Sequence, residues 1–198
     1  RLALTALDRE AVYPRVRELV DALFANVPSG LGSRGGIRLN RKELSVVLKL
    51  GAEWAVRQGM GDESDLERIE ERGVIQGADP DIISDRAFER GKDQLGTLGS
   101  GNHFLELGFI EEIFDEKTAR EWGIFLGQVT IMVHSGSRGF GYQVCDDFLA
   151  KMVKSAQAEN IELPDRQLAC TRLTSSLARE YLAAMAAAAN FAFANRQI

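Results

Sequence analysis

The chain has 198 residues with a hydrophobic fraction of 45%, so it is long enough to bury a sizeable core. Its formal net charge of −5 argues against a protein that coats nucleic acid through bulk charge, although a local basic groove is compatible with it. No apolar run approaches the length that spans a bilayer, and no basic region followed by an apolar block indicates a signal peptide.

The first part of the chain predicts one short strand followed by helices. The apolar run 2–7 is typical of a strand. Residues 8–25 show helical spacing, with Pro14 expected near the first turn, where its missing N–H costs little. After a glycine-rich loop, Asn40 is expected to cap the next helix with Glu43 as its reciprocal partner. That helix is expected to bury one face: Leu44, Val47, Leu48, Ala52 and Ala55.

The middle of the chain changes from helical to strand character. Short helices are predicted at 62–72 and 84–90, with a turn at 78–81 between them. Residues 104–114 and 123–134 are rich in β-branched and aromatic side chains and predict two strands.

Helical patterns return at 139–158 and 174–195. Thr174 is expected to cap the second of these helices. Its buried face is expected to contain Leu177, Tyr181, Met185 and Ala188. The order of helices, strands and helices favours an α+β fold with a mixed or antiparallel sheet flanked by helices. No linker or repeat interrupts residues 1–198, which predicts a single domain.

Both histidines of the chain lie in glycine-rich turns beside the predicted strands. His103 falls in Gly-Ser-Gly-Asn-His-Phe-Leu-Glu just before one strand, and His134 begins His-Ser-Gly-Ser-Arg-Gly just after the other. Imidazole is the commonest ligand for borderline divalent metals, and the two rings can meet at the ends of neighbouring strands. Asn102 and Glu106 add oxygen donors. In an extended segment these two would share a face while His103 points elsewhere.

The second histidine motif also suits a phosphate. Ser135, Ser137 and the flanking amides offer hydrogen bonds, and Arg138 offers a bidentate fork. Glycines at positions 136, 139 and 141 let a backbone approach a ligand closely. The alternative left open is that both histidines are structural and that Ser137 and Arg138 lie in an ordinary surface turn.

Other notable residues have simpler explanations. Residues 28–30 are expected to be a structural turn, and Asp146 and Asp147 a solvent-facing pair near a helix N-terminus. The two cysteines, Cys145 and Cys170, do not make a disulfide framework, which favours a reducing, cytoplasmic setting. Each is expected to be a small core residue rather than a metal ligand.

The motifs resemble those of one known family. Residues 94–106, Gln-Leu-Gly-Thr-Leu-Gly-Ser-Gly-Asn-His-Phe-Leu-Glu, are similar to a signature of the RtcB-type RNA-splicing ligases. Residues 134–139, with Gly141 and Gln143-Val144 after them, resemble that family's second histidine block. The downstream helix at 188–197 and the loop Pro-Ser-Gly-Leu-Gly at 28–32 also fit. The resemblance covers essentially the whole chain and implies an RtcB-like fold, of which residues 1–198 would be the central portion.

The resemblance implies an activity, two cofactors and partners. The family joins RNA 2′,3′-cyclic phosphate or 3′-phosphate ends to 5′-hydroxyl ends, using GTP and two Mn²⁺ sites, through a guanylylated histidine. The expected partners are therefore GTP and RNA, either tRNA halves or broken RNA ends, together with an archease-type activating protein. No membrane partner is expected.

The resemblance also implies roles for particular residues. By position, His103 and His134 would be manganese ligands. Asn102 would contact the phosphates or the metal, and Glu106 would recognise the guanine edge. Phosphate or RNA contacts are expected from two further residues, Ser137 and Arg138.

The chain departs from the family pattern in ways that limit its expected activity. The family's Asp-x-Gly-Cys-Gly block, which supplies metal ligands, is expected upstream of Arg1. Its third metal histidine and its nucleophilic histidine are expected downstream of Ile198. Tyr142 stands where the family commonly has histidine. We therefore expect no catalytic nucleophile in this segment, which would be inactive by itself. The alternatives are a metal-dependent phosphoesterase acting on RNA ends and a non-catalytic RNA- or nucleotide-binding fragment.

Overall fold

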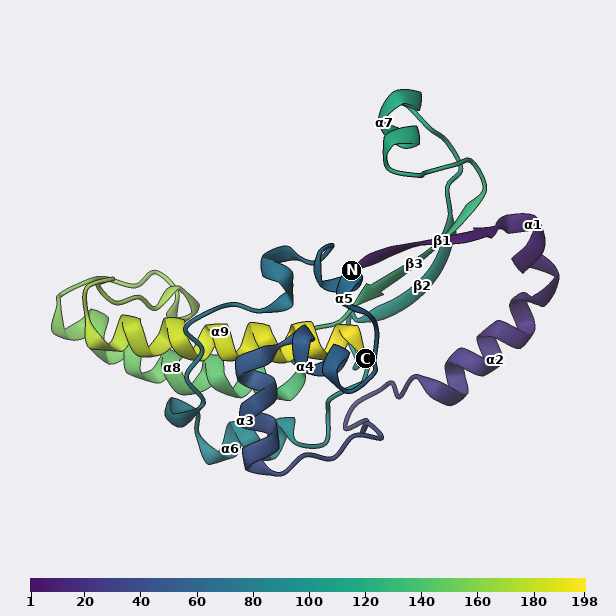
Figure 1. Cartoon of the computed structure of the whole chain (residues 1–198). Helices are drawn as coiled ribbons and strands as arrows, with labels where there is room; N and C mark the ends of the chain where they lie inside the picture. Colours follow the sequence, from purple (N-terminus) through teal and green to yellow (C-terminus); the bar gives the residue numbers. More distant parts are fainter. The chain divides into compact units, whose positions relative to one another are not determined.

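The computed structural model describes residues 1–198 as two compact units (Figure 1). The sheet unit comprises Arg1–Ser33 and Thr97–Ser135, and the helical unit comprises Arg34–Gly96 and Gly136–Ile198. The predicted α+β class with an antiparallel sheet is confirmed, whereas the single domain stays a prediction. No helix in the structure combines the length and the apolar character needed to cross a membrane.

The sheet unit is built on three antiparallel strands in the order β1-β3-β2. These are β1 (Leu2–Asp8), β2 (Phe104–Phe109) and β3 (Gln128–His134). The predicted strands at 104–114 and 123–134 were too long. Gly123 and Gly127 have positive φ values of 70° and 78°, which extended backbone does not allow. Helix α7 (Glu116–Glu121) occupies part of the connection between β2 and β3.

The helix predicted at 8–25 is present but interrupted. Helix α1 (Arg9–Val12) is capped by Asp8, whose side chain accepts from the Ala11 N–H. A 3₁₀ turn at Tyr13–Arg15 then separates it from α2 (Val16–Asn26). Pro14 lies in that turn rather than at the start of the helix. Because proline lacks an N–H and its ring clashes with the preceding turn, it breaks the helix at this point.

The helical unit packs its helices around one aromatic cluster. Its elements are α3 (Arg41–Leu50), α4 (Ala52–Arg57), α5 (Glu63–Leu66), α6 (Asp85–Gly91), α8 (Arg138–Ala158) and α9 (Ser176–Gln197), with 3₁₀ turns at Glu70–Gly73, Pro80–Ile82 and Arg166–Leu168. Phe140 of α8 stacks on Phe191 of α9 with ring centroids 5.2 Å apart. Phe88 of α6 meets Phe140 edge-on at 6.3 Å. The predicted buried face of residues 44–55 is confirmed.

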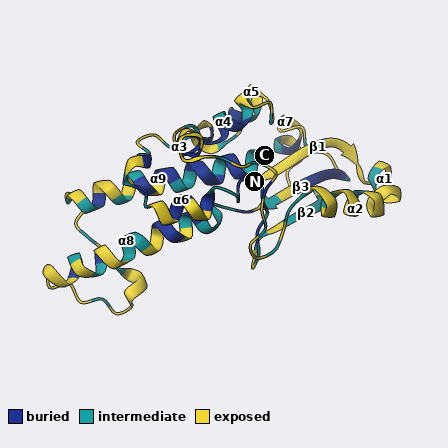
Figure 2. Ribbon diagram, turned by 90° about the horizontal axis from the view of Figure 1, so that it is seen from below, coloured by how far each residue is buried: buried dark blue, intermediate teal, exposed yellow.

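Helix α9 lies at the centre of this unit, and Figure 2 shows much of its length in the colour of buried residues. It packs against α3, α4 and α8. Two details of the prediction were wrong. Ser175, not Thr174, caps the helix by accepting from the Ala178 N–H. Met185 is 43% exposed. The buried side of the helix is formed by Phe191 and by alanines, whose small side chains let the neighbouring helices approach closely.

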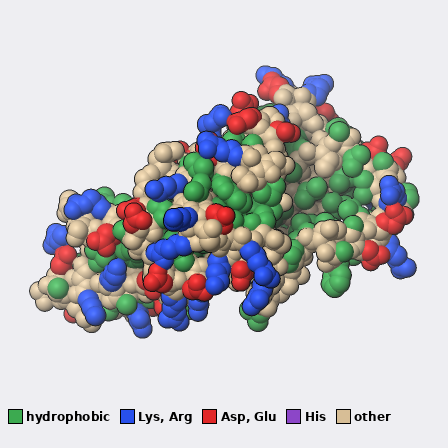
Figure 3. Space-filling model, turned by 60° about the horizontal axis from the view of Figure 1, so that its bottom comes forward, with side chains coloured by type: hydrophobic (Ala, Val, Ile, Leu, Met, Phe, Trp, Pro, Cys, Tyr) green, Lys and Arg blue, Asp and Glu red, His purple; other side chains and the backbone are tan.

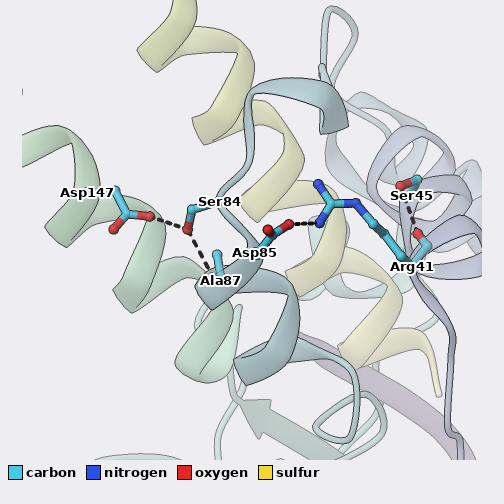
Figure 4. A network of polar contacts seen from close by, with 6 residues as sticks. All are labelled: Arg41, Ser45, Ser84, Asp85, Ala87 and Asp147. Atoms are coloured by element: carbon cyan, nitrogen blue, oxygen red, sulfur yellow. Dashed lines mark hydrogen bonds and ion pairs between the residues drawn. The ribbon is translucent and has the colours of Figure 1, made fainter.

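Three further predictions, for two residues in helix α8 and one beyond it, were wrong. Cys145 and, beyond the helix, Cys170 are exposed rather than in the core. Asp147 lies in the middle of α8, not at its N-terminus. Its carboxylate accepts from Ser84 Oγ at 2.6 Å and from Gln143 Nε2 at 2.7 Å. Figure 4 shows the first of these contacts beside the Arg41–Asp85 ion pair. Only Asp146 of the predicted pair is exposed.

The predicted capping box of α3 is confirmed and gives a direct test of local stability. Asn40 Oδ1 accepts from the Glu43 N–H at 3.0 Å, and Glu43 Oε2 accepts from the Asn40 N–H at 2.8 Å. Asn40→Ala removes the side-chain oxygen that accepts from the Glu43 N–H, which has no partner within the helix. The free energy of unfolding is therefore expected to fall by about 1 kcal/mol. Urea unfolding measures this. Lys42→Ala, at an exposed position of the same helix, is the control, and equal stability of the two variants would contradict the capping role.

Candidate metal and phosphate site

The two histidines meet at one end of the sheet. His134 is the last residue of β3 and pairs with Phe104, the first residue of β2. His103 immediately precedes Phe104, so the antiparallel pairing brings both imidazoles to the same place. Their ring centroids are 6.0 Å apart, with 35° between the planes. The Phe104 ring lies 5.2 Å from that of His134 and packs beside it.

A glycine turn explains why His103 faces His134. Gly99 and Gly101 have φ values of 105° and 74°, which residues with a side chain adopt only with strain. Asn102 therefore lies, exposed, in a turn rather than in an extended strand. The orientation in which His103 points elsewhere was expected only for an extended segment, and residues 101–102 form a turn instead.

The turn before His103 is held by part-buried hydrogen bonds. Ser135 Oγ donates to the Leu98 carbonyl at 2.7 Å, and the Leu98 N–H donates to the Pro28 carbonyl at 2.9 Å. The Gly30 N–H donates to the Gly99 carbonyl at 2.7 Å, and Ser29 pairs with Gly99 in an isolated parallel bridge. Residues 28–30 thus have a structural role, as predicted, but the turn itself lies at residues 31–32. Ser135, which the sequence suggested as a phosphate contact, is only 9% exposed. Its anchoring role has no sequence signal, because its partner is remote along the chain.

Glu106 lies on the same face of the sheet as His134. It is opposite Met132, two residues along β2 from Phe104, and directly opposed residues point to the same face. Its carboxylate is exposed, and this face also carries partly exposed Phe104 and Met132. The structure thus brings His103, His134 and Glu106 to one part of the sheet unit.

Ser137 and Arg138 begin helix α8 in the helical unit. Arg138 has a positive φ of 54°, and burial lowers the pKa of its guanidinium from the usual value, although arginine stays charged in proteins. The Gly139 N–H donates to Gln94 Oε1 at 2.8 Å. A Cβ at position 141 would lie 2.0 Å from Ser137 Oγ. Gly141 therefore leaves room for the Ser137 side chain. The sequence had suggested instead that this glycine lets the backbone approach a ligand.

Asn195 of α9 supports the start of this segment. Its Oδ1 accepts from the Gly96 N–H at 2.8 Å, and its Nδ2 donates to the Gly136 carbonyl at 3.2 Å. Gly96 and Gly136 are the residues at which the chain leaves and re-enters the helical unit. The sequence interpretation did not identify Asn195, because nothing local distinguishes it from other asparagines in a helix.

The residues of the sheet unit fit a divalent metal in part. Imidazole, amide and carboxylate groups are donor types that suit borderline ions such as Mn²⁺, and the structure places the two imidazoles close together. No group of three or more His, Cys, Asp or Glu side chains is arranged to hold a metal. These residues therefore offer two nitrogen ligands, and further ligands are needed to complete a coordination shell.

The anchoring by Ser135 gives a prediction about metal affinity. Ser135→Ala removes the hydroxyl that donates to the Leu98 carbonyl, so the turn that positions His103 is expected to loosen. We expect Mn²⁺ affinity to fall about tenfold, as for other losses of support outside the ligands. Isothermal titration with Mn²⁺ measures this. Ser45→Ala, which removes a hydroxyl bonded to Arg41 in α3, is the control, and equal affinity of the two variants would contradict the anchoring role.

Comparison with known proteins identifies relatives of the whole chain. A family model described as tRNA-splicing ligase RtcB matches residues 1–198. The curated tRNA-splicing ligase RtcB of Archaeoglobus fulgidus is 50% identical over 198 residues, which cover 100% of this chain and 41% of that protein. The protein of the same name from Pyrococcus furiosus is 52% identical over 198 residues, covering 100% of this chain and 20% of that protein. The chain thus spans less than half the length of these relatives.

Proposed function

Because the chain belongs to the tRNA-splicing ligase RtcB family, we propose that residues 1–198 carry a metal- and nucleotide-binding part of an RNA ligase. The proposed reaction joins RNA 2′,3′-cyclic phosphate or 3′-phosphate ends to 5′-hydroxyl ends with GTP and Mn²⁺. The observation that supports this most is the approach of the His103 and His134 rings to 6.0 Å at the end of the sheet. The substrates would be tRNA halves, as the names of the relatives suggest, or broken RNA ends.

Each site residue has a role that its chemistry supports. His103 and His134 would hold Mn²⁺ through neutral imidazole nitrogens. A bound divalent ion supplies neutralisation of phosphate charge and polarisation of a phosphoryl oxygen. The Asn102 amide can donate to phosphate oxygens. The Glu106 carboxylate, which only accepts, suits the N–H groups of a guanine edge. In the helical unit, Arg138 can bind a phosphate bidentately, and the Ser137 hydroxyl can donate to it.

The proposal assigns both histidines of the chain to the metal. The histidine that receives GMP in the proposed reaction is therefore not one of these residues, and this segment by itself is not expected to join RNA. An archease-type activator and a cytoplasmic setting remain predictions.

The test is an RNA-joining assay with a full-length protein that contains residues 1–198. The substrates are one RNA with a 3′-phosphate and one with a 5′-hydroxyl, incubated with GTP and Mn²⁺. A joined product that depends on both additions is expected. Release of inorganic phosphate without joining would replace the proposal with a phosphoesterase. Retained RNA binding without either reaction would indicate a non-catalytic binding module.

A further inference from the structure

We propose that the exposed ring of Tyr142, together with the Arg90 guanidinium, forms a platform on which a nucleobase of single-stranded RNA stacks. The proposal rests on the proposed function for the identity of the ligand, since RNA is the substrate of the reaction argued above. It adds a binding subsite in the helical unit that is distinct from the histidines, Asn102 and Glu106.

The platform is built by two packed helices. Tyr142 lies in the second turn of α8 and is 65% exposed. Arg90 belongs to α6, which packs against α8, and its guanidinium carbon lies 5.4 Å from the centre of the Tyr142 ring. A Cβ at position 139 would lie 3.7 Å from the Arg90 Cβ, so Arg90 leaves α6 directly beside the first turn of α8. The two side chains are thus held together by the helix packing.

The charges around the ring favour a polyanion. Arg90 forms no ion pair in the structure, and neither does Arg86, which is exposed one turn earlier on α6. Arg138 lies one turn before Tyr142 on α8, and Asp146, exposed, lies one turn after it. Two nearby acids are already engaged, Glu89 by Lys92 and Asp147 by Ser84. Figure 3 shows lysine and arginine side chains spread among acidic ones over the helical unit.

An aromatic ring beside an arginine side chain is a typical contact for unpaired bases. Bases of single-stranded RNA stack on aromatic side chains and on arginine planes, while neighbouring cations bind the phosphates. Stacking tolerates every base, because every base has a π face. Arg138, one turn away, is the proposed phosphate contact, so a base on Tyr142 and the phosphate of the same or the next nucleotide can be bound along one side of α8.

The test is binding of a fluorescent single-stranded RNA of ten nucleotides to the 198-residue chain, followed by anisotropy without GTP or metal. Tyr142→Ala is expected to weaken binding about tenfold, whereas Tyr142→Phe keeps the ring and is expected to bind as the unchanged chain does. Arg90→Ala is expected to weaken binding, because it removes the guanidinium plane that lies beside the Tyr142 ring. Trp122→Ala removes an equally exposed aromatic ring, 70% exposed, from the sheet unit and serves as the control.

Two results would overturn the platform. One is that the chain binds no single-stranded RNA, and the other is that Tyr142→Ala and Trp122→Ala bind alike. The binding assay does not depend on RNA joining. If Tyr142→Ala weakens RNA binding but the full-length protein does not join RNA, the platform stands and the proposed ligase function is wrong. If the full-length protein joins RNA but Tyr142→Ala binds RNA as the unchanged chain does, the ligase function stands and the platform is wrong.

Discussion

His103→Ala and His134→Ala are each expected to reduce RNA joining by a full-length protein about a thousandfold or more. Each variant removes one of two imidazoles that lie 6.0 Å apart and that we assign to the metal. A bound metal stabilises developing charge by several kcal/mol, and each 1.4 kcal/mol corresponds to a factor of ten. His134 is exposed and His103 only half-buried, so the truncations open no cavity in the core. Single-turnover joining of a 3′-phosphate RNA to a 5′-hydroxyl RNA measures the effect.

The control for this prediction is Glu112→Gln, at an exposed position of the sheet unit. It is expected to join RNA at the unchanged rate. Far-ultraviolet circular dichroism of each variant verifies that the fold is retained. If either histidine variant joins RNA within threefold of the unchanged protein, the assignment of that histidine to the metal is wrong.

Asn190→Leu is expected to lower the free energy of unfolding by about 3 kcal/mol or more. Asn190 is fully buried in α9. Its Nδ2 donates to the Leu48 and Ile75 carbonyls at 2.8 and 3.0 Å, and its Oδ1 accepts from the Ile75 N–H at 2.7 Å. Leucine has a similar size but leaves these three backbone groups unpaired in the interior, and each unpaired buried group costs about 1–3 kcal/mol.

Urea unfolding of the chain measures this loss. Asn26→Leu is the matched control, because Asn26 is exposed at the end of α2 and makes one hydrogen bond, from its Nδ2 to the Ala22 carbonyl at 2.8 Å. Its effect is expected to stay below about 1 kcal/mol. A loss of less than about 1 kcal/mol for Asn190→Leu would show that the interior tolerates the unpaired groups and that this network does not hold α9 to α3.

The features that the sequence predicted well depend on residues close together in the chain. The Asn40–Glu43 capping box involves residues three apart and was confirmed. The limits of α8 and α9 were predicted to within two residues. In contrast, the buried face of α9 was partly misplaced at Met185. Alanine suits both interior and surface positions, so an alanine-rich helix gives a weak signal of which side is buried.

The features that the sequence did not predict depend on contacts between distant segments. Nothing local shows that β3 is the central strand or that Asp147 accepts from Ser84. The approach of His103 and His134 was foreseen only as a meeting of strand ends, because the register that pairs Phe104 with His134 is a tertiary property. The assigned roles of Asn102, Glu106, Ser137 and Arg138 stay predictions, since they concern ligands.

The most direct test of the account is a Mn²⁺ titration of the 198-residue chain, followed by electron paramagnetic resonance and repeated with His103→Ala and His134→Ala. The account predicts saturable binding by the unchanged chain that both substitutions abolish, because the two imidazoles supply the nitrogen ligands of one site. Saturable binding that neither substitution weakens would contradict the claim that these residues form a metal site, whereas no saturable binding by this segment would show that the site needs the further ligands outside it.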